Sequence, residues 1–205
     1  MSSFFDVQLF LSVFVTLVVI MNPPGVVPIF LGLTATLTHK QKVSAARRAA
    51  TVALGVIAAF AVFGQEILTY LHISLPALQS AGGLLLLLVA LQLLTGQEAG
   101  GSSDAGVNVA LVPLGTPILG GPGAIVTTML AVRRVQGFGG FLAVAVGLVA
   151  ALFTVWLFLR FAGQVNRLLR DSGTMLATRI AGLLLSAIAV QMMADGIRAF
   201  INTKT

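Results

Sequence analysis

The sequence predicts an all-α polytopic membrane protein with six transmembrane helices, arranged as two inverted three-helix repeats. Of the 205 residues, 58% are hydrophobic and only 9% are charged, a composition foreign to water-soluble domains. This length accommodates about six spans of roughly 20 residues joined by short loops. Two apolar segments are also interrupted by Pro-Gly motifs at matching places in the two halves of the chain.

The first predicted span covers approximately residues 4–36 and contains the motif Asn22-Pro23-Pro24-Gly25 near its middle. Proline removes a backbone donor and clashes with the preceding turn, and glycine weakens a helix further. We therefore expect the helix to open at membrane depth. Broken backbone is tolerated at that depth only where it packs in protein or lines a polar cavity.

The remaining elements of the first half follow in order. A basic loop after the first span is expected to hold His39, Lys40, Lys42, Arg47 and Arg48. The second span covers about residues 44–71, residues 72–76 form a short turn, and the third span covers 77–95. Residues 96–106, GQEAGGSSDAG, are a connector that is flexible by composition. The single membrane domain, 1–205, is thus divided into a first repeat, 1–95, and a second, 107–205.

In the second half, the fourth span is predicted at about residues 107–132 and is interrupted by Gly120-Gly121-Pro122-Gly123. The fifth and sixth spans cover about 137–162 and 178–201. With the N-terminus outside, the inside loops hold eight basic residues and the outside segments hold four. The positive-inside rule therefore predicts a multi-pass protein of the cell inner (plasma) membrane with both termini outside.

Three sets of matching residues, separated by nearly the same number of positions in the sequence, indicate an internal duplication. Pro24-Gly25 matches Pro122-Gly123 at an offset of 98, and the small-residue stripe at 45, 49 and 53 matches the stripe at 143, 147 and 151 at the same offset. The segment Gly83-Leu-Leu-Leu with Gln92 matches Gly182-Leu-Leu-Leu with Gln191 at 99. Because each half has three spans, the second half enters the membrane from the opposite side. Inverted repeats with paired interrupted helices are typical of secondary transporters.

The two interrupted motifs, NPPGVVPIFL at 22–31 and PILGGPGAI at 117–125, resemble those of the MarC family of bacterial and archaeal membrane proteins. The resemblance covers nearly the whole chain, including AVQMM at 189–193, and departs from the family pattern at Pro24 and at Val26-Val27. It implies a six-span inner-membrane protein related to the LysE-type exporters. It also implies transport of small neutral amino acids such as glycine and alanine.

The two breaks are the predicted substrate-binding site. The half-helix after each break offers backbone N–H groups and a positive dipole end to a carboxylate, and the half-helix before it offers carbonyls to an ammonium group. The alternative is a purely structural kink. The predicted binding residues at the breaks are Asn22, Pro23, Pro24, Gly25, Gly120, Gly121, Pro122 and Gly123.

Polar side chains within the spans are further candidates. Gln92 and Gln191 either bind the substrate or hydrogen-bond between helices. Thr127 either binds the substrate or bonds back to its own helix, as does the adjacent Thr128. Glu66 is the proton-coupling candidate, with a position at the outer interface as its alternative. Asp195 is expected nearer the interface, paired with Arg198 at i+3.

Several classes of function are disfavoured. The chain has no cysteine, and His39 and His72 fall on opposite sides of the membrane, so we expect no metal site, cofactor or catalytic residues. The net charge of +6 lies in short loops and is topogenic, so no nucleic-acid partner is expected, nor is a cleaved signal peptide. The expected partners are a small-molecule substrate, the lipid bilayer and possibly further copies of the chain.

These observations together predict a secondary transporter of a small neutral solute, a glycine- or alanine-like amino acid, which works by alternating access around the two breaks. A passive channel and an exporter of other small metabolites are the alternative functions. An intramembrane enzyme or a scaffold is disfavoured, because paired catalytic groups are absent from the sequence.

Overall fold

A computed structural model describes residues 5–95, 119–135 and 137–202, apart from the side chains at 166, 169–172 and 174. These residues form helices, and no strand occurs among them. The helices are α1 (Val7–Met21), α2 (Pro23–Leu33), α3 (His39–Tyr70), α4 (Leu75–Thr95), α5 (Pro122–Arg134), α6 (Phe138–Arg160) and α7 (Ala162–Asn202).

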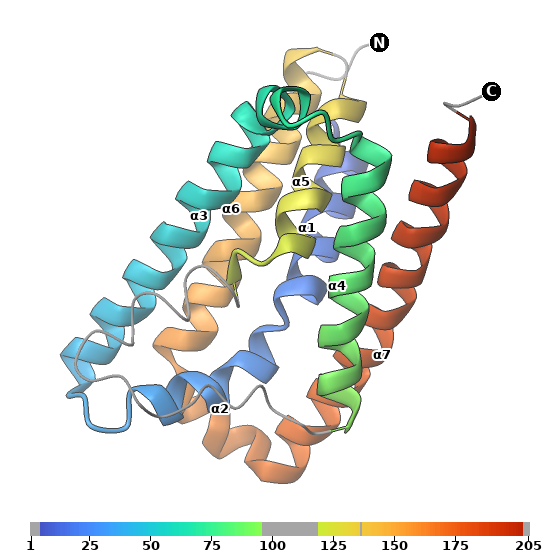
Figure 1. The fold of residues 1–205 in the computed structure, drawn as a ribbon. Coiled ribbons are helices and arrows are strands. Elements are labelled where there is room, and N and C mark those ends of the chain that lie inside the picture. The colour runs from blue at the N-terminus through green and yellow to red at the C-terminus, as the bar shows by residue number, and fades with distance from the viewer. Residues whose placement is uncertain (1–4, 96–118, 136, 203–205) are drawn as a thin grey trace.

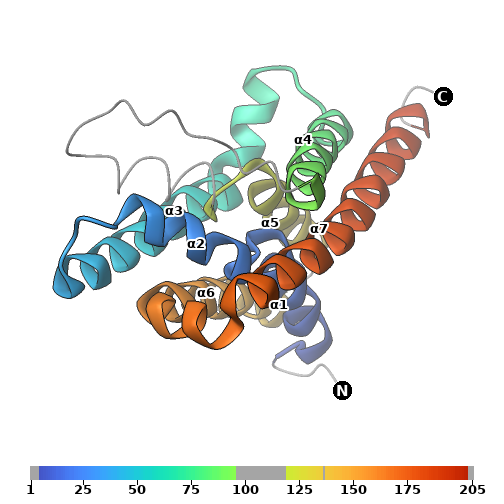
Figure 2. The same ribbon diagram turned by 90° about the horizontal axis from the view of Figure 1, so that it is seen from below.

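The helices of the described chain form one bundle. One side of the bundle contains α3 and α6, the other contains α4 and α7, and α1 and α5 lie between them (Figures 1 and 2). The described chain begins and finishes at the same end of the bundle, whereas α2 and the junction of α6 with α7 lie at the other end (Figure 1).

Four helical segments of the described chain are long and apolar enough to cross a membrane, namely α3, α4, α6 and Met175–Asn202 of α7. The pair α1 and α2 makes a fifth if it is counted as one bent span. The predicted fourth span lies partly outside the described residues, which begin again at Leu119.

The first Pro-Gly motif coincides with a break between α1 and α2. Asn22 ends α1 in the left-handed conformation, with φ 42° and ψ 64°, and the two helices are bent by about 40°. The Asn22 N–H still donates to the Val18 and Val19 carbonyls, so the end of α1 is capped by backbone. Pro23 and Pro24 then start α2, where a fixed φ suits the first turn and a missing N–H costs nothing.

The second Pro-Gly motif lies at the start of α5. Gly121 is its extended N-cap, with φ −63° and ψ 166°, and Pro122 is its first residue. Leu119 and Gly120 precede it and are buried. The segment 107–118, which the sequence assigns to the first part of this span, lies outside the described residues.

Two segments predicted as connections are helical. The basic segment after residue 38 is the start of α3, because Thr38 and Gln41 form a capping box that begins the helix there. Likewise, α7 begins at Ala162 rather than near residue 178, so α6 and α7 are separated by Phe161 alone. Charged residues led us to predict both segments as connections, although both sequences are compatible with a helix.

Packing between α4 and α7 is reciprocal. A Cβ placed on Gly83 of α4 would lie 2.9 Å from the Ala189 carbonyl oxygen, and one on Gly182 of α7 would lie 3.2 Å from the Ala90 carbonyl oxygen. Gly83 and Gly182 are 99 residues apart, as are Ala90 and Ala189. The contacts run in opposite directions along the two helices, which are therefore antiparallel.

Burial repeats between α3 and α6 at the offset of 98. The buried positions of α3 and α6 correspond in six pairs, which are 45 with 143, 46 with 144, 49 with 147, 53 with 151, 57 with 155, and 64 with 162 just beyond α6. The helices α3 and α6 pack against each other, and glycines at two of these positions contact other helices, Gly64 the Met129 side chain of α5 and Gly147 the Val13 side chain of α1.

Candidate functional site

A cavity with a mainly apolar lining lies between the two halves of the chain. Its volume is about 450 Å³, within the range of small-molecule sites. Its walls come from α1 and α4 of the first half and from α5 and α7 of the second. The lining residues are Leu9, Ser12, Val13, Thr16, Gln79, Thr127, Leu130, Ala131, Arg134, Ala187, Ile188, Gln191, Met192 and Asp195.

The cavity exists where two apolar clusters separate. One cluster is formed mainly by α1, α2, α3 and α6, and the other by α4, α5 and α7. Val13 on the cavity wall belongs to the first cluster and Met192 to the second. Apolar residues therefore form the frame of the cavity, and a few polar side chains project into it.

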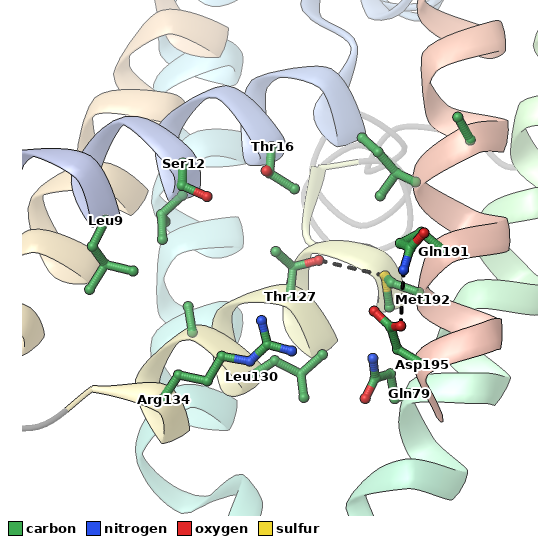
Figure 3. Close-up of a pocket in the computed structure, with 14 residues that line it drawn as sticks. Leu9, Ser12, Thr16, Gln79, Thr127, Leu130, Arg134, Gln191, Met192 and Asp195 are labelled. Carbon is green, nitrogen blue, oxygen red and sulfur yellow. Dashed lines mark hydrogen bonds between the residues drawn. The ribbon is translucent and has the colours of Figure 1, made fainter. Parts of the chain in front are cut away.

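The polar groups of the cavity include one acid and one base on opposite walls. The Gln191 Nε2 donates to the Asp195 Oδ1 over 2.9 Å, one turn apart on α7. Arg134 extends from α5 toward the wall that carries Asp195 and Gln79 (Figure 3). A cation and an anion facing one space can hold the two ends of a zwitterion.

Hydroxyl groups line the inner part of the cavity. Ser12 and Thr16 project from α1, and Thr127 projects from α5 with its Oγ1 3.9 Å from the Met192 sulfur (Figure 3). Hydroxyls both donate and accept, so they suit either end of a small polar solute. The neighbouring Thr128 is buried and donates to the Ala124 carbonyl within α5, which satisfies its hydroxyl.

The residues of the two breaks lie deeper than the cavity lining. At the first break Asn22, Pro23 and Gly25 are buried, and at the second Gly120 and Gly123 are buried. Thr16 precedes Asn22 by six residues and Thr127 follows Gly123 by four, so along each helix the cavity ends roughly 6–9 Å from a break. The breaks thus lie beyond the inner end of this cavity.

Asn22 has an acceptor without a partner. Its side chain is only 5% exposed, and its Oδ1 accepts no hydrogen bond among the described residues. A Cβ on Gly25 would overlap the Asn22 amide, so the amide lies over the first turn of α2. A buried, unsatisfied acceptor carries a desolvation cost, which a donor on a bound solute would remove.

Backbone donors at the breaks are fewer than the motifs suggest. Pro23 and Pro24 carry no N–H, and Val26 donates to the Asn22 carbonyl. At the second break Pro122 carries no N–H, and Ala124 donates to the Gly121 carbonyl. Each break therefore has Gly25 or Gly123 as its main backbone donor to a solute, whereas Arg134 offers a full charge.

The predicted polar side chains are divided between the cavity and the protein surface. Thr127 and Gln191 line the cavity, although Gln191 is exposed, whereas Gln92 is exposed near the end of α4 and does not line the cavity. Glu66 is exposed on α3, outside the cavity lining, and its proton-coupling role stays a prediction. Asp195 bonds to Gln191 instead of the expected Arg198, because both Gln191 and Asp195 face the cavity.

Five polar lining residues were not among the predicted site residues: Ser12, Thr16, Gln79, Arg134 and Asp195. Arg134 was assigned to a helix end as a topogenic charge. A usable signal existed in the spacing of Ser12 with Thr16, and of Gln191 with Asp195, since residues four apart share a helix face. That spacing identifies the polar face of each helix, but it does not predict which helix faces lie opposite each other in the bundle.

The helical spans define an α-helical integral membrane protein, and the cavity between its two halves is its candidate site for a small solute. A family model described as the MarC family integral membrane protein matches residues 7–201. The chain therefore belongs to the MarC family, as its interrupted motifs led us to expect.

Its relatives cover nearly the same length. A UPF0056 membrane protein of Methanocaldococcus jannaschii is 36% identical over 200 residues, covering 94% of this chain and 98% of the relative. One of Bacillus subtilis is 32% identical over 202 residues, covering 94% and 96%. One of Escherichia coli is 30% identical over 211 residues, covering 96% and 95%. No solved structure matches the chain.

Proposed function

We propose that this protein is a secondary transporter of small neutral zwitterionic solutes, of which glycine and alanine are the simplest. The observation that carries the proposal is the cavity between the two halves, with Arg134 and Asp195 on facing walls. Arg134 binds the carboxylate of the solute, and Asp195 and Gln191 bind its ammonium group.

The proposed architecture is six spans in two inverted repeats. Reciprocal contacts of Gly83 and Gly182 support it, because a pair of contacts that exchange partners indicates a two-fold axis. Packing between elements has the same symmetry, since α2 packs on α6 as α5 packs on α3, and α5 packs on α4 as α2 packs on α7. An axis of this kind lies in the membrane plane and relates two opposite faces.

Alternating access follows from this arrangement. The break at Asn22 and the break before Pro122 are the proposed hinges. Their glycines and the Asn22 amide contact the solute only after it has moved inward from the cavity, whose lining ends roughly 6–9 Å from each break along the helices. The cavity lining includes residues near the starts of α1 and α4 and near the ends of α5 and α7, which lie at the end of the bundle where the described chain begins and finishes (Figure 1). By the positive-inside rule we assign that end to the outside of the inner membrane.

The test is counterflow of labelled glycine or alanine in proteoliposomes. R134Q and D195N should each lower counterflow at subsaturating solute about tenfold or more, because a charge-assisted hydrogen bond contributes about 1.5–3 kcal/mol. R133Q is the matched control, since Arg133 is adjacent, exposed and outside the cavity lining. Counterflow itself separates a carrier from a passive channel, and its absence for every small amino acid would refute the proposal.

A further inference from the structure

Gln79 of α4 is a buried polar side chain that lines the cavity without a hydrogen-bond partner. It is only 7% exposed, and it belongs to the cavity lining. Its amide makes no hydrogen bond to any of the described residues, whereas the buried Thr34 and Thr128 each donate to the carbonyl four residues earlier. A desolvated amide without partners costs free energy, which a polar solute in the cavity would recover.

Gln79 and Asp195 lie on neighbouring turns where α4 packs against α7. A Cβ placed on Gly196 would lie 2.9 Å from the Pro76 carbonyl oxygen, so the turn of α4 at 76–80 contacts the turn of α7 that holds Asp195. Both side chains line the cavity, and Figure 3 shows the Gln79 amide next to the Asp195 carboxylate. The buried amide therefore lies beside the acid that the proposed function assigns to the ammonium group of the solute.

Three acceptor oxygens are available on this wall of the cavity. The Gln191 Nε2 donates to the Asp195 Oδ1, which leaves the Gln191 Oε1 and the second carboxylate oxygen without a partner among the described residues. The Gln79 Oε1 is the third, because no hydrogen bond within the described chain fixes its amide and rotation about the last side-chain bond presents the oxygen. A primary ammonium group has three N–H donors, so its donors match these acceptors in number.

We propose that Gln79, Gln191 and Asp195 form a three-acceptor site that selects a primary ammonium group, and that Gln79 determines this selectivity. The inference rests on the proposed function and narrows its substrates to zwitterions with an unsubstituted amino group. Each N-methyl group removes one N–H donor. A solute with a single donor directs it to the charged carboxylate, where the hydrogen bond is strongest, and leaves the buried Gln79 amide without a partner.

The test compares isomers that differ only in the atom to which their methyl groups are attached. Labelled glycine is bound to the purified protein in detergent and displaced by 2-aminoisobutyrate, with both methyls on carbon, or by N,N-dimethylglycine, with both on nitrogen. The two zwitterions have the same composition and the same carboxylate. The N-methylated isomer should bind about tenfold more weakly, because it loses hydrogen bonds from a charged group. Alanine and N-methylglycine should differ in the same direction by less.

Gln79→Leu tests whether Gln79 is the source of this preference. Leucine has no acceptor, so Q79L should weaken the binding of 2-aminoisobutyrate and leave that of N,N-dimethylglycine nearly unchanged. The ratio between the isomers should therefore fall about threefold or more. Q65L is the matched control, since Gln65 is exposed on α3 and lies outside the cavity lining. Each variant is first checked for a monodisperse profile in detergent.

Equal binding of the two isomers to the wild-type protein would overturn the three-acceptor site, and that measurement needs no substitution. A wild-type ratio in monodisperse Q79L would overturn the role of Gln79, and failure of glycine itself to bind would overturn the site as well. Failure of the transport proposal alone would look different, because the preference between isomers would persist in detergent while labelled glycine showed no counterflow in proteoliposomes.

Discussion

At both Pro-Gly breaks a proline starts a helix, and the breaks differ in the conformation of the N-cap residue and in what covers their glycine. At the first break the Asn22 amide lies over Gly25, whereas at the second the Leu86 side chain of α4 lies over Gly123. The position equivalent to Asn22 is Gly120, which has no side chain to offer. The comparison teaches that two matching motifs can each start a helix while one places a polar group over its glycine and the other an apolar side chain.

The largest expected effect comes from filling both breaks. The double variant Gly25→Leu with Gly123→Leu should abolish glycine counterflow, because both side chains would occupy the space that now holds Asn22 and Leu86. Counterflow per folded protein is the measurement, with folded protein determined by size-exclusion chromatography. A variant with normal counterflow would show that neither break takes part in transport.

Single alanine substitutions should distinguish the two breaks by what lies over the glycine of each. Gly25→Ala and Gly123→Ala should each lower the free energy of unfolding by about 1–3 kcal/mol, the usual cost of overpacking. Adding Asn22→Gly should remove the cost at Gly25 and leave the cost at Gly123 unchanged, because the Asn22 amide is the group that the new Cβ meets at the first break alone. Gly55→Ala is the control, since a Cβ there meets nothing within 4 Å.

That double-mutant cycle is measured by thermal or denaturant unfolding in detergent. Equal rescue of both alanine variants by Asn22→Gly would contradict the assignment of different covers to the two breaks. No rescue of Gly25→Ala would show that Asn22 moves aside at little cost.

The smallest expected effect on stability is that of Asn22→Gly alone. Glycine accepts a φ of 42° without strain, and the change removes a buried acceptor that has no partner, so the free energy of unfolding should change by only about 0.5 kcal/mol. The half-saturation concentration for glycine should nevertheless rise several-fold. An unchanged half-saturation value would exclude Asn22 as a contact of the solute.

Element type was predictable from composition and turn residues, whereas element boundaries failed at charged segments. The capping box of Thr38 with Gln41 was readable in the sequence, yet the basic run after it was taken for a loop. Similarly, because of the polar residues after Ala162, the first turns of α7 were predicted as a connection. Local helix signals in these segments were stronger than the expectation that charges near a membrane lie in loops.

The candidate site was only partly predictable. Thr127 and Gln191 were identified because they are polar in apolar spans, and both line the cavity. Arg134 and Asp195 lie near helix ends, where a charged side chain costs little free energy. A charge at such a position therefore does not indicate a binding site. Their joint role depends on α5 and α7 facing one space, and that arrangement is set by packing against α4 rather than by any local pattern.

The presence of Arg134 and Asp195 in a cavity near one end of the bundle has a thermodynamic consequence for transport. If Arg134 and Asp195 bind the solute only when it enters from the side of the membrane on which the described chain begins and finishes, the affinity for the solute differs between the two sides. Around a closed cycle without an energy source, that inequality must be balanced by the resting preference of the empty carrier for one orientation. Substitutions far from the solute that alter this preference would then change the apparent affinity on both faces at once.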